Sequence, residues 1–470
     1  MTLPDYKDFF RDKKITVMGL GLLGRGVGDV EFLSEQGADL IVTDLKNEAQ
    51  LGESLLRLRK LPRFGEIKFV LGEHRLEDFR NRDFILKAAG VPLDSPYIAE
   101  ARKNNIPIEM SASLFAKLSG ATIVGVTGTR GKTTTTAMIY ECLKQCGEGL
   151  NRSEGSVGPR ATALGLARTT FLRKVVLGGN IRGVSTLALL SEVEEGDIVV
   201  LELDSWQLQG FGDSKISPHV AVWTTFMTDH MNYYGDSMEK YFEDKAQIFR
   251  HQTGEDYFII GEQADPVIPA NVLAKRIIAR ASDISRDWRL DVIGEHNRAN
   301  AACARAALSA LGIPEDRIRK NLEAFHAVEG RLQYVGTIRG RRVYNDNNAT
   351  TPDATIAALK ALRSYEGLVL IMGGADKGLS TFTLRHEISA SGAKPVFLAG
   401  SGTDRFLKDN PFSEPPFVAK NLNEAIEEAF RLSLTGETIL FSPGFASFGL
   451  FNNEYERNDQ FLELISARKK

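Results

Sequence analysis

The stretch that decides the fold runs from residue 124 to residue 136 and reads Val-Gly-Val-Thr-Gly-Thr-Arg-Gly-Lys-Thr-Thr-Thr-Thr. An apolar run at 121–126 leads into it, and residues 137–143 continue with a helical pattern. This order predicts a strand, a glycine-rich turn and the start of a helix. Such a turn points backbone N–H groups inward, and the helix start adds a positive dipole end, so the stretch predicts a binding site for phosphate groups.

Individual residues of the turn match the parts of a phosphate site. Gly128 and Gly131 allow the backbone to turn tightly. Lys132 has the reach to contact terminal phosphates, and the Thr133 hydroxyl is a ligand for Mg²⁺. A standard phosphate loop has another glycine five positions before Gly131, where this chain has Val126, so the motif is a shorter variant.

Composition places the chain among ordinary globular proteins. Its 470 residues predict two to four domains, with 43% apolar and 25% charged residues. The net charge of −3 argues against a dedicated nucleic-acid binder, and no apolar run is long enough to span a bilayer. The polar N-terminus and the three cysteines favour a reducing compartment. We therefore expect a cytoplasmic protein, monomeric, with neither nucleic acid nor membrane as a partner.

Three α/β blocks follow one another along the chain. The first, at 1–118, opens with a strand and the turn Gly19-X-Gly21-X-X-Gly24, and its second strand ends at Asp44, as in a Rossmann-like domain. The second, at 119–330, has apolar strands that suit the central parallel sheet of a P-loop-type ATPase domain. The third, at 331–470, alternates strands and helices and predicts another open parallel sheet of the Rossmann-like kind.

Polar residues after the phosphate loop are further candidates. Glu202 and His230 each follow an apolar strand, where α/β sheets place ligands. Lys245 lies on a helix, and Asn300 lies one turn into another. Taken singly, Glu202 fits a strand-end ion pair, His230 a structural histidine and Lys245 a solvated lysine. The stretch that holds Asn300 fits a helix start capped by Asn297. The stretch 147–173 is expected to be a solvated loop with one short helix.

The order of these motifs resembles the Mur ligase family over essentially the whole chain. The resemblance is carried by Thr-Gly-Thr-X-Gly-Lys-Thr (127–133), Gly-Gly-Asn (178–180), Glu202, Asp229-His230, Lys245, His-Asn-X-X-Asn (296–300), Gly-Arg (330–331), Asn-Asp-Asn-Asn-Ala-Thr-Thr-Pro (345–352), Gly-Gly-Ala-Asp-Lys (373–377) and Ser-Pro-Gly-Phe-Ala-Ser (442–447). The Rossmann-like first block makes the chain most similar to members that add D-glutamate to UDP-N-acetylmuramoyl-L-alanine. The implied fold is three α/β domains.

The resemblance also implies site residues, by position in this sequence. ATP would be bound by Gly128, Thr129, Arg130, Gly131, Lys132, Thr133, Thr134, Asn300, Arg331 and Asp346. Lys132, Glu202, His230 and Lys245 would be catalytic, and Mg²⁺ would be held by Thr133, Glu202, His230 and a carbamylated Lys245. The UDP-sugar would contact Gly21, Leu22, Leu23, Asp44, Gly90 and Asn180, and the incoming glutamate Thr350, Lys377, Ser447 and Phe448.

The implied reaction is ATP-dependent amide-bond formation through an acyl phosphate, in peptidoglycan precursor synthesis. Departures from the family pattern fall at the acceptor: Asn348 stands where the family has a lysine, and Gly449 where it has an aspartate. These departures leave open L-glutamate or another acceptor. A folate-type glutamate ligase, or an oxidoreductase that uses the first block for a dinucleotide, are the remaining alternatives.

Overall fold

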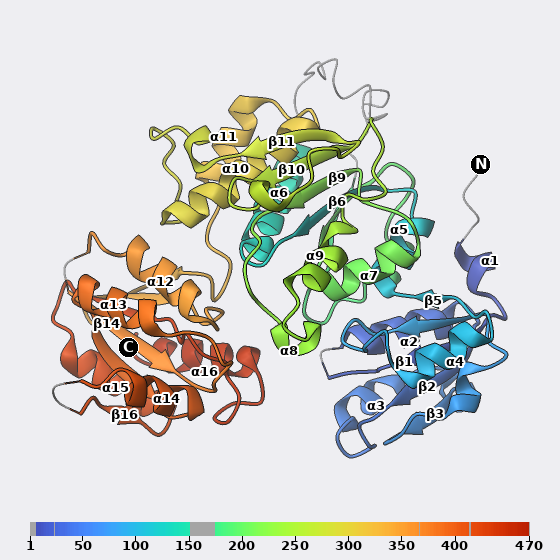
Figure 1. Ribbon diagram of the computed structural model, residues 1–470, viewed down its shortest axis with the longest axis horizontal. Coiled ribbons are helices and arrows are strands. Elements are labelled where there is room, and N and C mark those ends of the chain that lie inside the picture. Colours follow the sequence, from blue (N-terminus) through green and yellow to red (C-terminus); the bar gives the residue numbers. More distant parts are fainter. Residues whose placement is uncertain (1–5, 23, 151–173, 366, 413–414, 470) are drawn as a thin grey trace. The chain divides into compact units, whose positions relative to one another are not determined.

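The computed structural model describes residues 6–22, 24–150, 174–365, 367–412 and 415–469. The chain forms two compact units (Figure 1). Unit 1 comprises residues 1–283 and 300–321, and unit 2 comprises residues 284–299 and 322–470. Two sheets belong to unit 1 and one sheet to unit 2. The predicted domain boundaries after residues 118 and 330 stay predictions.

The first sheet has the strand order β3-β2-β1-β4-β5, and all its pairs are parallel. Its strands are β1 (Lys14–Met18), β2 (Asp39–Asp44), β3 (Lys68–Leu71), β4 (Phe84–Lys87) and β5 (Ile108–Glu109). The helices are α1 (Tyr6–Phe10), α2 (Arg25–Glu35), α3 (Gly52–Leu58), α4 (Pro96–Lys103) and α5 (Ser111–Leu118). The strand order reverses between β1 and β4, and such a switch point is where open α/β sheets bind ligands. The Rossmann-like prediction is confirmed.

The second sheet has the order β11-β10-β9-β6-β8-β7 and is also parallel throughout. Its strands are β6 (Thr122–Thr127), β7 (Val175–Gly179), β8 (Ile198–Glu202), β9 (Val220–Trp223), β10 (Tyr257–Gly261) and β11 (Lys275–Ala279). The helices are α6 (Lys132–Leu150), α7 (Ser205–Asp213), α8 (Met231–Tyr234), α9 (Met238–Ala246), α10 (Glu295–Ala310) and α11 (Glu315–Glu323). The glycine-rich turn joins β6 to α6, so it opens at the centre of a buried sheet.

The third sheet, in unit 2, has the order β12-β13-β17-β14-β15-β16. Its strands are β12 (Gln333–Ile338), β13 (Arg341–Asn345), β14 (Leu368–Gly373), β15 (Lys394–Leu398), β16 (Val418–Ala419) and β17 (Thr438–Phe441). The helices are α12 (Pro352–Ala361), α13 (Phe382–Ser391), α14 (Ser401–Asp409), α15 (Leu422–Leu432) and α16 (Glu454–Ser466). The predicted open parallel sheet is present from β13 to β16, and at one edge β12 pairs antiparallel with β13. Arg339 and Gly340, both at positive φ, make the two-residue turn of this hairpin.

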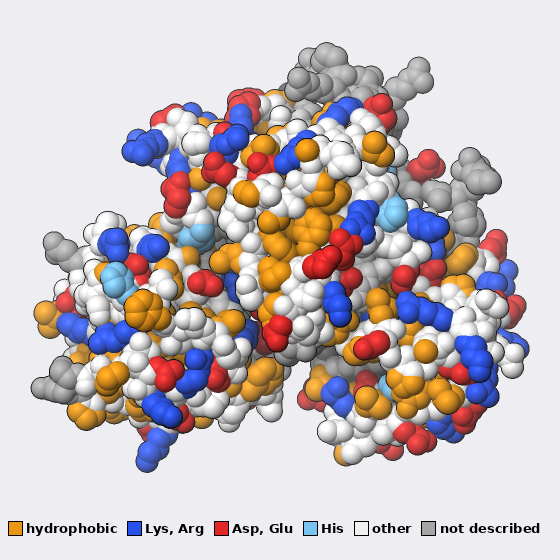
Figure 2. Space-filling view, in the orientation of Figure 1, with side chains coloured by type: hydrophobic (Ala, Val, Ile, Leu, Met, Phe, Trp, Pro, Cys, Tyr) orange, Lys and Arg blue, Asp and Glu red, His pale blue; other side chains and the backbone are white. Residues whose placement is uncertain are grey.

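Apolar residues fill both units. In unit 1 one continuous core includes Leu20, which follows β1, and Val27 of α2. The same core includes Val199 and Leu201 of β8 in the second sheet. In unit 2 the residues of β14 alternate between two cores, one on each face of the third sheet. Positive and negative side chains are interspersed on the surface that Figure 2 shows. No helix in the described part of the chain combines the length and apolar character that crossing a membrane requires.

Candidate active site

The turn between β6 and α6 has room only for glycine at two positions. Gly128 has a φ of 141°, and a Cβ there would lie 2.1 Å from the Thr224 hydroxyl oxygen. Gly131 has a φ of 87°, and a Cβ there would lie 2.3 Å from the Asn300 side-chain oxygen. The turn is therefore a tight backbone cradle, and the structure places Asn300 directly against it. A cradle that a single methyl group would block fits the close approach of phosphate oxygens.

Lys132 begins α6 and folds back over this cradle. Its ammonium group donates hydrogen bonds to the carbonyl oxygens of Gly128 at 2.9 Å and Thr129 at 3.3 Å. The side chain is half-buried. The Thr129 hydroxyl in turn bridges to the backbone of Met227, which follows β9.

Arg130 and His230 come from the same end of the sheet. The Arg130 guanidinium donates to Asp229 at 2.8 Å, and the Arg130 N–H donates to the Thr225 hydroxyl at 2.8 Å. His230 adopts the left-handed backbone conformation, with its ring centroid 4.9 Å from that of Trp206. These contacts join the turn after β6 to the segment after β9.

Lys245 of α9 is buried against the cradle, which corrects the interpretation of a solvated surface lysine. Its side chain is 1% exposed, and its amine donates to the Thr127 hydroxyl at 3.3 Å and the Gly128 carbonyl at 3.1 Å. The amine also lies 4.9 Å from the centre of the Tyr241 ring. Burial, followed by the like charge of Lys132, lowers the pKa of Lys245 well below its ordinary value.

Glu202 ends β8, beside β6, and is almost fully buried. Its carboxylate accepts a hydrogen bond from the Asn180 amide at 3.4 Å. The Asn180 side-chain oxygen accepts another from Arg25, the first residue of α2, at 2.6 Å. Sequence reasoning did not single out Arg25, although it is the first cation after the glycines of the N-terminal turn. Among the residues that the structure describes, no three His, Cys, Asp or Glu side chains gather into a metal site.

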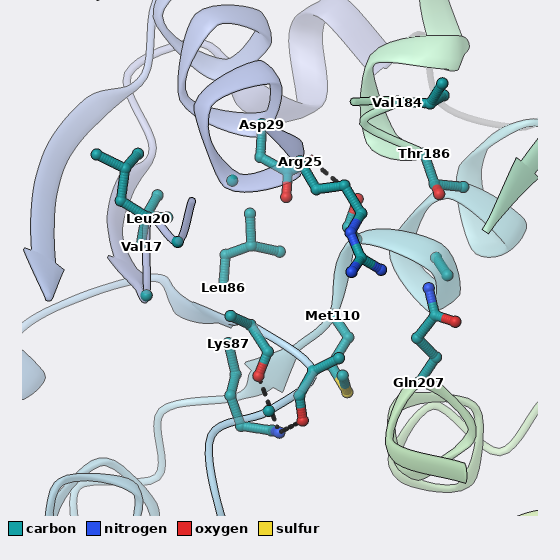
Figure 3. Close-up of a pocket in the computed structure, with 18 of the residues that line it drawn as sticks. Val17, Leu20, Arg25, Asp29, Leu86, Lys87, Met110, Val184, Thr186 and Gln207 are labelled. Atoms are coloured by element: carbon teal, nitrogen blue, oxygen red, sulfur yellow. Dashed lines mark hydrogen bonds between the residues drawn. The ribbon is translucent and has the colours of Figure 1, made fainter. Parts of the chain in front are cut away.

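A cavity of about 210 Å³ opens at the end of β1 and β4 (Figure 3). Gly21, Leu22 and Gly90 line it, as do Arg25 and Lys87. Asp44 supports this cavity rather than lining it, because its carboxylate accepts from the N–H groups of Leu20, Gly21 and Lys46 at 2.9, 3.0 and 2.9 Å. Leu23, another candidate, lies outside the described residues.

Two ionisable groups near the cavity are shifted by burial. Lys87 donates to the carbonyl groups of Ala88, Ala89 and Val91, and burial lowers its pKa to about 8. Asp29 of α2 accepts from the hydroxyls of Ser185 at 2.6 Å and Ser111 at 2.8 Å. Burial raises the pKa of Asp29 to about 6, partly opposed by these hydrogen bonds. Figure 3 shows Asp29 and Arg25 projecting from the same helix.

The remaining candidates lie in unit 2. The Asp346 carboxylate accepts from the Leu332 N–H at 3.0 Å and the Ser442 hydroxyl at 2.8 Å, and burial raises its pKa to about 7. Lys377 donates to the Thr350 hydroxyl at 3.0 Å. The other three are Arg331, Ser447, which is buried, and Phe448, whose side chain is exposed. The ATP candidates are thus divided, with Asn300 in unit 1 and Arg331 and Asp346 in unit 2.

Comparisons with known proteins cover nearly the whole chain. The N-terminal domain of MurD-like Mur ligases matches residues 13–109, the Mur ligase middle domain matches 126–275, and the Mur ligase glutamate ligase domain matches 330–445. The UDP-N-acetylmuramoylalanine–D-glutamate ligase of Roseiflexus sp. (strain RS-1) is 34% identical, over 97% of this chain and 98% of the relative. The enzyme of the same name from Borreliella burgdorferi (strain ZS7) is 32% identical, over 98% and 99%.

A solved structure shares the fold. The UDP-N-acetylmuramate-alanine ligase of Thermotoga maritima aligns with a TM-score of 0.57 and 20% identity, over 97% of this chain and 99% of that one. At this identity the likeness concerns the fold alone. The sequence relatives carry the stronger evidence, because they are above 30% identical from end to end. The chain belongs to the Mur ligase family of ATP-dependent amide-bond ligases.

Proposed function

We propose that this Mur ligase joins D-glutamate to UDP-N-acetylmuramoyl-L-alanine, with ATP as the energy source, in peptidoglycan precursor synthesis. The observation that carries the proposal is the convergence of Lys132 and Lys245 on the carbonyl oxygen of Gly128, beneath the glycine cradle. The names of the full-length relatives support the choice of substrate and acceptor.

The ATP half of the site follows from the cradle. Gly128, Thr129, Arg130, Gly131, Lys132, Thr133 and Thr134 would surround the phosphates, with Asn300, Arg331 and Asp346 around the rest of the nucleotide. Lys132 would place a fixed cation beside the transferred phosphoryl group, where negative charge is spread over its oxygens. The carboxylate of the L-alanyl group would attack that phosphorus, which yields an acyl phosphate and ADP.

A metal site beside the cradle would use Glu202, His230 and Lys245, with a further Mg²⁺ on Thr133. Among the described side chains no three His, Cys, Asp or Glu residues gather into a metal site, so this site would need a further carboxylate-like ligand. Carbamylation of Lys245 would supply it, because the carbamate carries two oxygens and a negative charge. The low pKa of the buried amine supports this step, since only the neutral amine reacts with CO₂. Bound Mg²⁺ would neutralise charge on the phosphates.

The sugar nucleotide and the amino acid would occupy separate places. We assign the UDP-sugar to the cavity at the end of β1 and β4, where Gly21, Leu22 and Gly90 line the wall. Leu23 and Asn180 stay predicted contacts, and Asp44 would act through the backbone N–H groups of Leu20 and Gly21 that it holds. D-Glutamate would bind in unit 2, near Thr350, Lys377, Ser447 and Phe448. Its amine would attack the acyl phosphate, and loss of phosphate from the tetrahedral intermediate would leave the amide. We also propose that the enzyme is a cytoplasmic monomer, consistent with its three free cysteines.

The test is a product assay with purified protein. We expect UDP-N-acetylmuramoyl-L-alanine, ATP and Mg²⁺ to give a ligated product by mass spectrometry with D-glutamate, with equal release of ADP. Lys132→Met should lower the rate by about a hundredfold or more, because a fixed charge at the phosphoryl group is lost. Lys144→Met, an exposed lysine on the same helix, is the matched control.

The same assay separates the alternatives. Product with L-glutamate alone would reassign the acceptor and keep the ligase chemistry. Glutamate addition to a folate but not to the UDP-sugar would overturn the substrate assignment. Near-normal ligation by Lys132→Met would remove the role given to the cradle.

A further inference from the structure

One chain of hydrogen bonds links the cavity of the first sheet to the proposed metal site of the second. Arg25 donates to the Asn180 side-chain oxygen at 2.6 Å, and the Asn180 amide nitrogen donates to Glu202 at 3.4 Å. Arg25 lines the cavity, whereas Glu202 lies at the end of β8 beside the phosphate loop. The side-chain oxygen of Asn180 therefore contacts Arg25, and its side-chain nitrogen contacts Glu202.

The backbone on both sides of this chain is fixed. The Asn180 N–H donates to the Glu202 carbonyl at 2.7 Å, and a Cβ on Gly179 would lie 2.1 Å from that same carbonyl oxygen. A Cβ on Gly26 would lie 2.4 Å from the carbonyl oxygen of Leu20, so the start of α2 is packed onto the N-terminal turn. With these backbones held, the direction of the Asn180 amide depends on its side-chain torsions and on the groups that contact it.

Arg25 selects one of the two possible orientations of the Asn180 amide. A guanidinium donates and never accepts, so it holds the oxygen of the Asn180 amide and leaves the NH₂ group facing Glu202. A flipped amide would present its oxygen to the Glu202 carboxylate, with no hydrogen to share. Asn180 in its observed orientation restrains one carboxylate oxygen of Glu202 and leaves the other for a cation.

We propose that Arg25 is a positioning residue that acts through Asn180 to orient Glu202 for divalent-cation binding. This inference rests on the proposed role of Glu202 as a metal ligand. It makes the metal site depend on a residue of helix α2 that also lines the cavity proposed for the sugar nucleotide. Arg25 touches no reacting atom in this role.

Metal binding tests the relay without turnover. The probe is Mn²⁺, followed by electron paramagnetic resonance in protein saturated with a non-hydrolysable ATP analogue, without the UDP-sugar. We expect Arg25→Met to weaken Mn²⁺ binding about fivefold, the worth of roughly one neutral hydrogen bond. Asn180→Ala should weaken it to a similar extent, and the double variant should bind no more weakly than Asn180→Ala alone. Arg59→Met, which changes an exposed arginine directly after α3, should bind Mn²⁺ like the wild type.

Kinetics provides the second readout. Arg25→Met should raise the Mg²⁺ concentration needed for half-maximal rate about fivefold at saturating UDP-sugar. Wild-type Mn²⁺ affinity in Arg25→Met, with only the KM for the UDP-sugar raised, would overturn the relay and leave Arg25 as a substrate contact. The relay would also be overturned if the double variant lost as much Mn²⁺ affinity as the product of the two single losses, or if the wild type bound no Mn²⁺. Wild-type protein that shows the relay but makes no D-glutamate product would contradict the proposed function alone.

Discussion

At the scale of single residues, burial decides what a lysine can do. Lys245 is enclosed by Thr127, Gly128 and Tyr241, and its pKa lies well below the ordinary value. A larger share of its amine is therefore neutral near pH 7.5, and a neutral amine can take up CO₂. Wild-type protein in ¹³C-bicarbonate should show a carbamate resonance by NMR. Lys245→Arg should lose that resonance and at least about a hundredfold in rate, because guanidinium cannot replace a carboxylate ligand.

Lys240→Arg is the matched control for this prediction, since Lys240 is exposed on the same helix, α9. It should keep both the resonance and the activity. An active Lys245→Arg enzyme, together with no carbamate signal in the wild type, would show that the buried amine serves only the fold.

The proposed acceptor side of the site would depend on a pair of residues in unit 2. Lys377 donates to Thr350, whereas Asn348 offers only a neutral amide where the family has a lysine. Charge-assisted hydrogen bonds to a carboxylate are roughly twice as strong as neutral ones, so Lys377 should carry most of the grip on glutamate. Asn348→Lys should lower the KM for D-glutamate, and Lys377→Ala should raise it about tenfold or more with the KM for ATP unchanged. Unchanged KM values in both variants would mean that neither residue faces the acceptor.

The role of the residues in the cradle could be predicted from the sequence, but the contacts that more distant residues make with the cradle could not. Gly128, Gly131 and Lys132 lie within five positions of one another, so this short motif by itself predicts the tight phosphate-binding turn. The burial of Lys245 comes from Thr127 and Gly128, more than a hundred positions earlier. Arg25 was missed for the same reason, because its partner Asn180 follows at a sequence separation of 155.

At the scale of elements, periodicity predicted the buried strands well and the short or edge elements poorly. The apolar runs at 198–203, 220–225 and 368–372 predict strands, and the structure has β8, β9 and β14 there. The edge strand β12 has partly exposed residues and no clear alternation, so its antiparallel pairing was not foreseen. The edge strand β11 and helix α14 were not predicted either, and the buried strand β10 is an exception that was also missed. The expectation for 147–173 concerns residues of which 151–173 lie outside the described structure, and it stays a prediction.

Helix α2 contacts its neighbours through the buried carboxyl group of Asp29, and this group makes the stability of the protein depend on pH. The pKa of Asp29 is raised by burial from 3.8 to about 6, so the native state binds more protons than the unfolded state between these values. The stability that Asp29 contributes is therefore present at low pH and is lost as the pH rises through about 6. Asp29→Asn keeps an oxygen for Ser185 and Ser111 and has no charge. The melting temperature of this variant, relative to wild type, should rise by about 2 °C between pH 5 and pH 7.5.

Thermal unfolding of Asp39→Asn, an exposed aspartate at the start of β2, serves as the control and should show no such trend. A relative melting temperature of Asp29→Asn that falls over the same pH range would mean that the native state favours the ionised carboxylate.

At the scale of the whole molecule, the proposed reaction uses residues from both units. The phosphate cradle, Lys245 and Asn300 belong to unit 1, whereas Arg331, Asp346 and Lys377 belong to unit 2. The chain passes between the units three times, after residues 283, 299 and 321. An acyl phosphate must meet the amine of glutamate before it meets water, so we expect the units to close around it when substrates are bound.

Closure should be visible by small-angle X-ray scattering. We expect the radius of gyration to decrease when the protein is saturated with the UDP-sugar, Mg²⁺ and a non-hydrolysable ATP analogue together, and to change less with any one alone. The radius of gyration of Lys132→Met should decrease less at the same ligand concentrations, because this variant lacks the positive charge that holds the ATP phosphates in the cradle. Lys144→Met should compact like the wild type. An unchanged radius with all three ligands bound would mean that the enzyme shields its acyl phosphate without domain closure, and that glutamate must reach it through a preformed site.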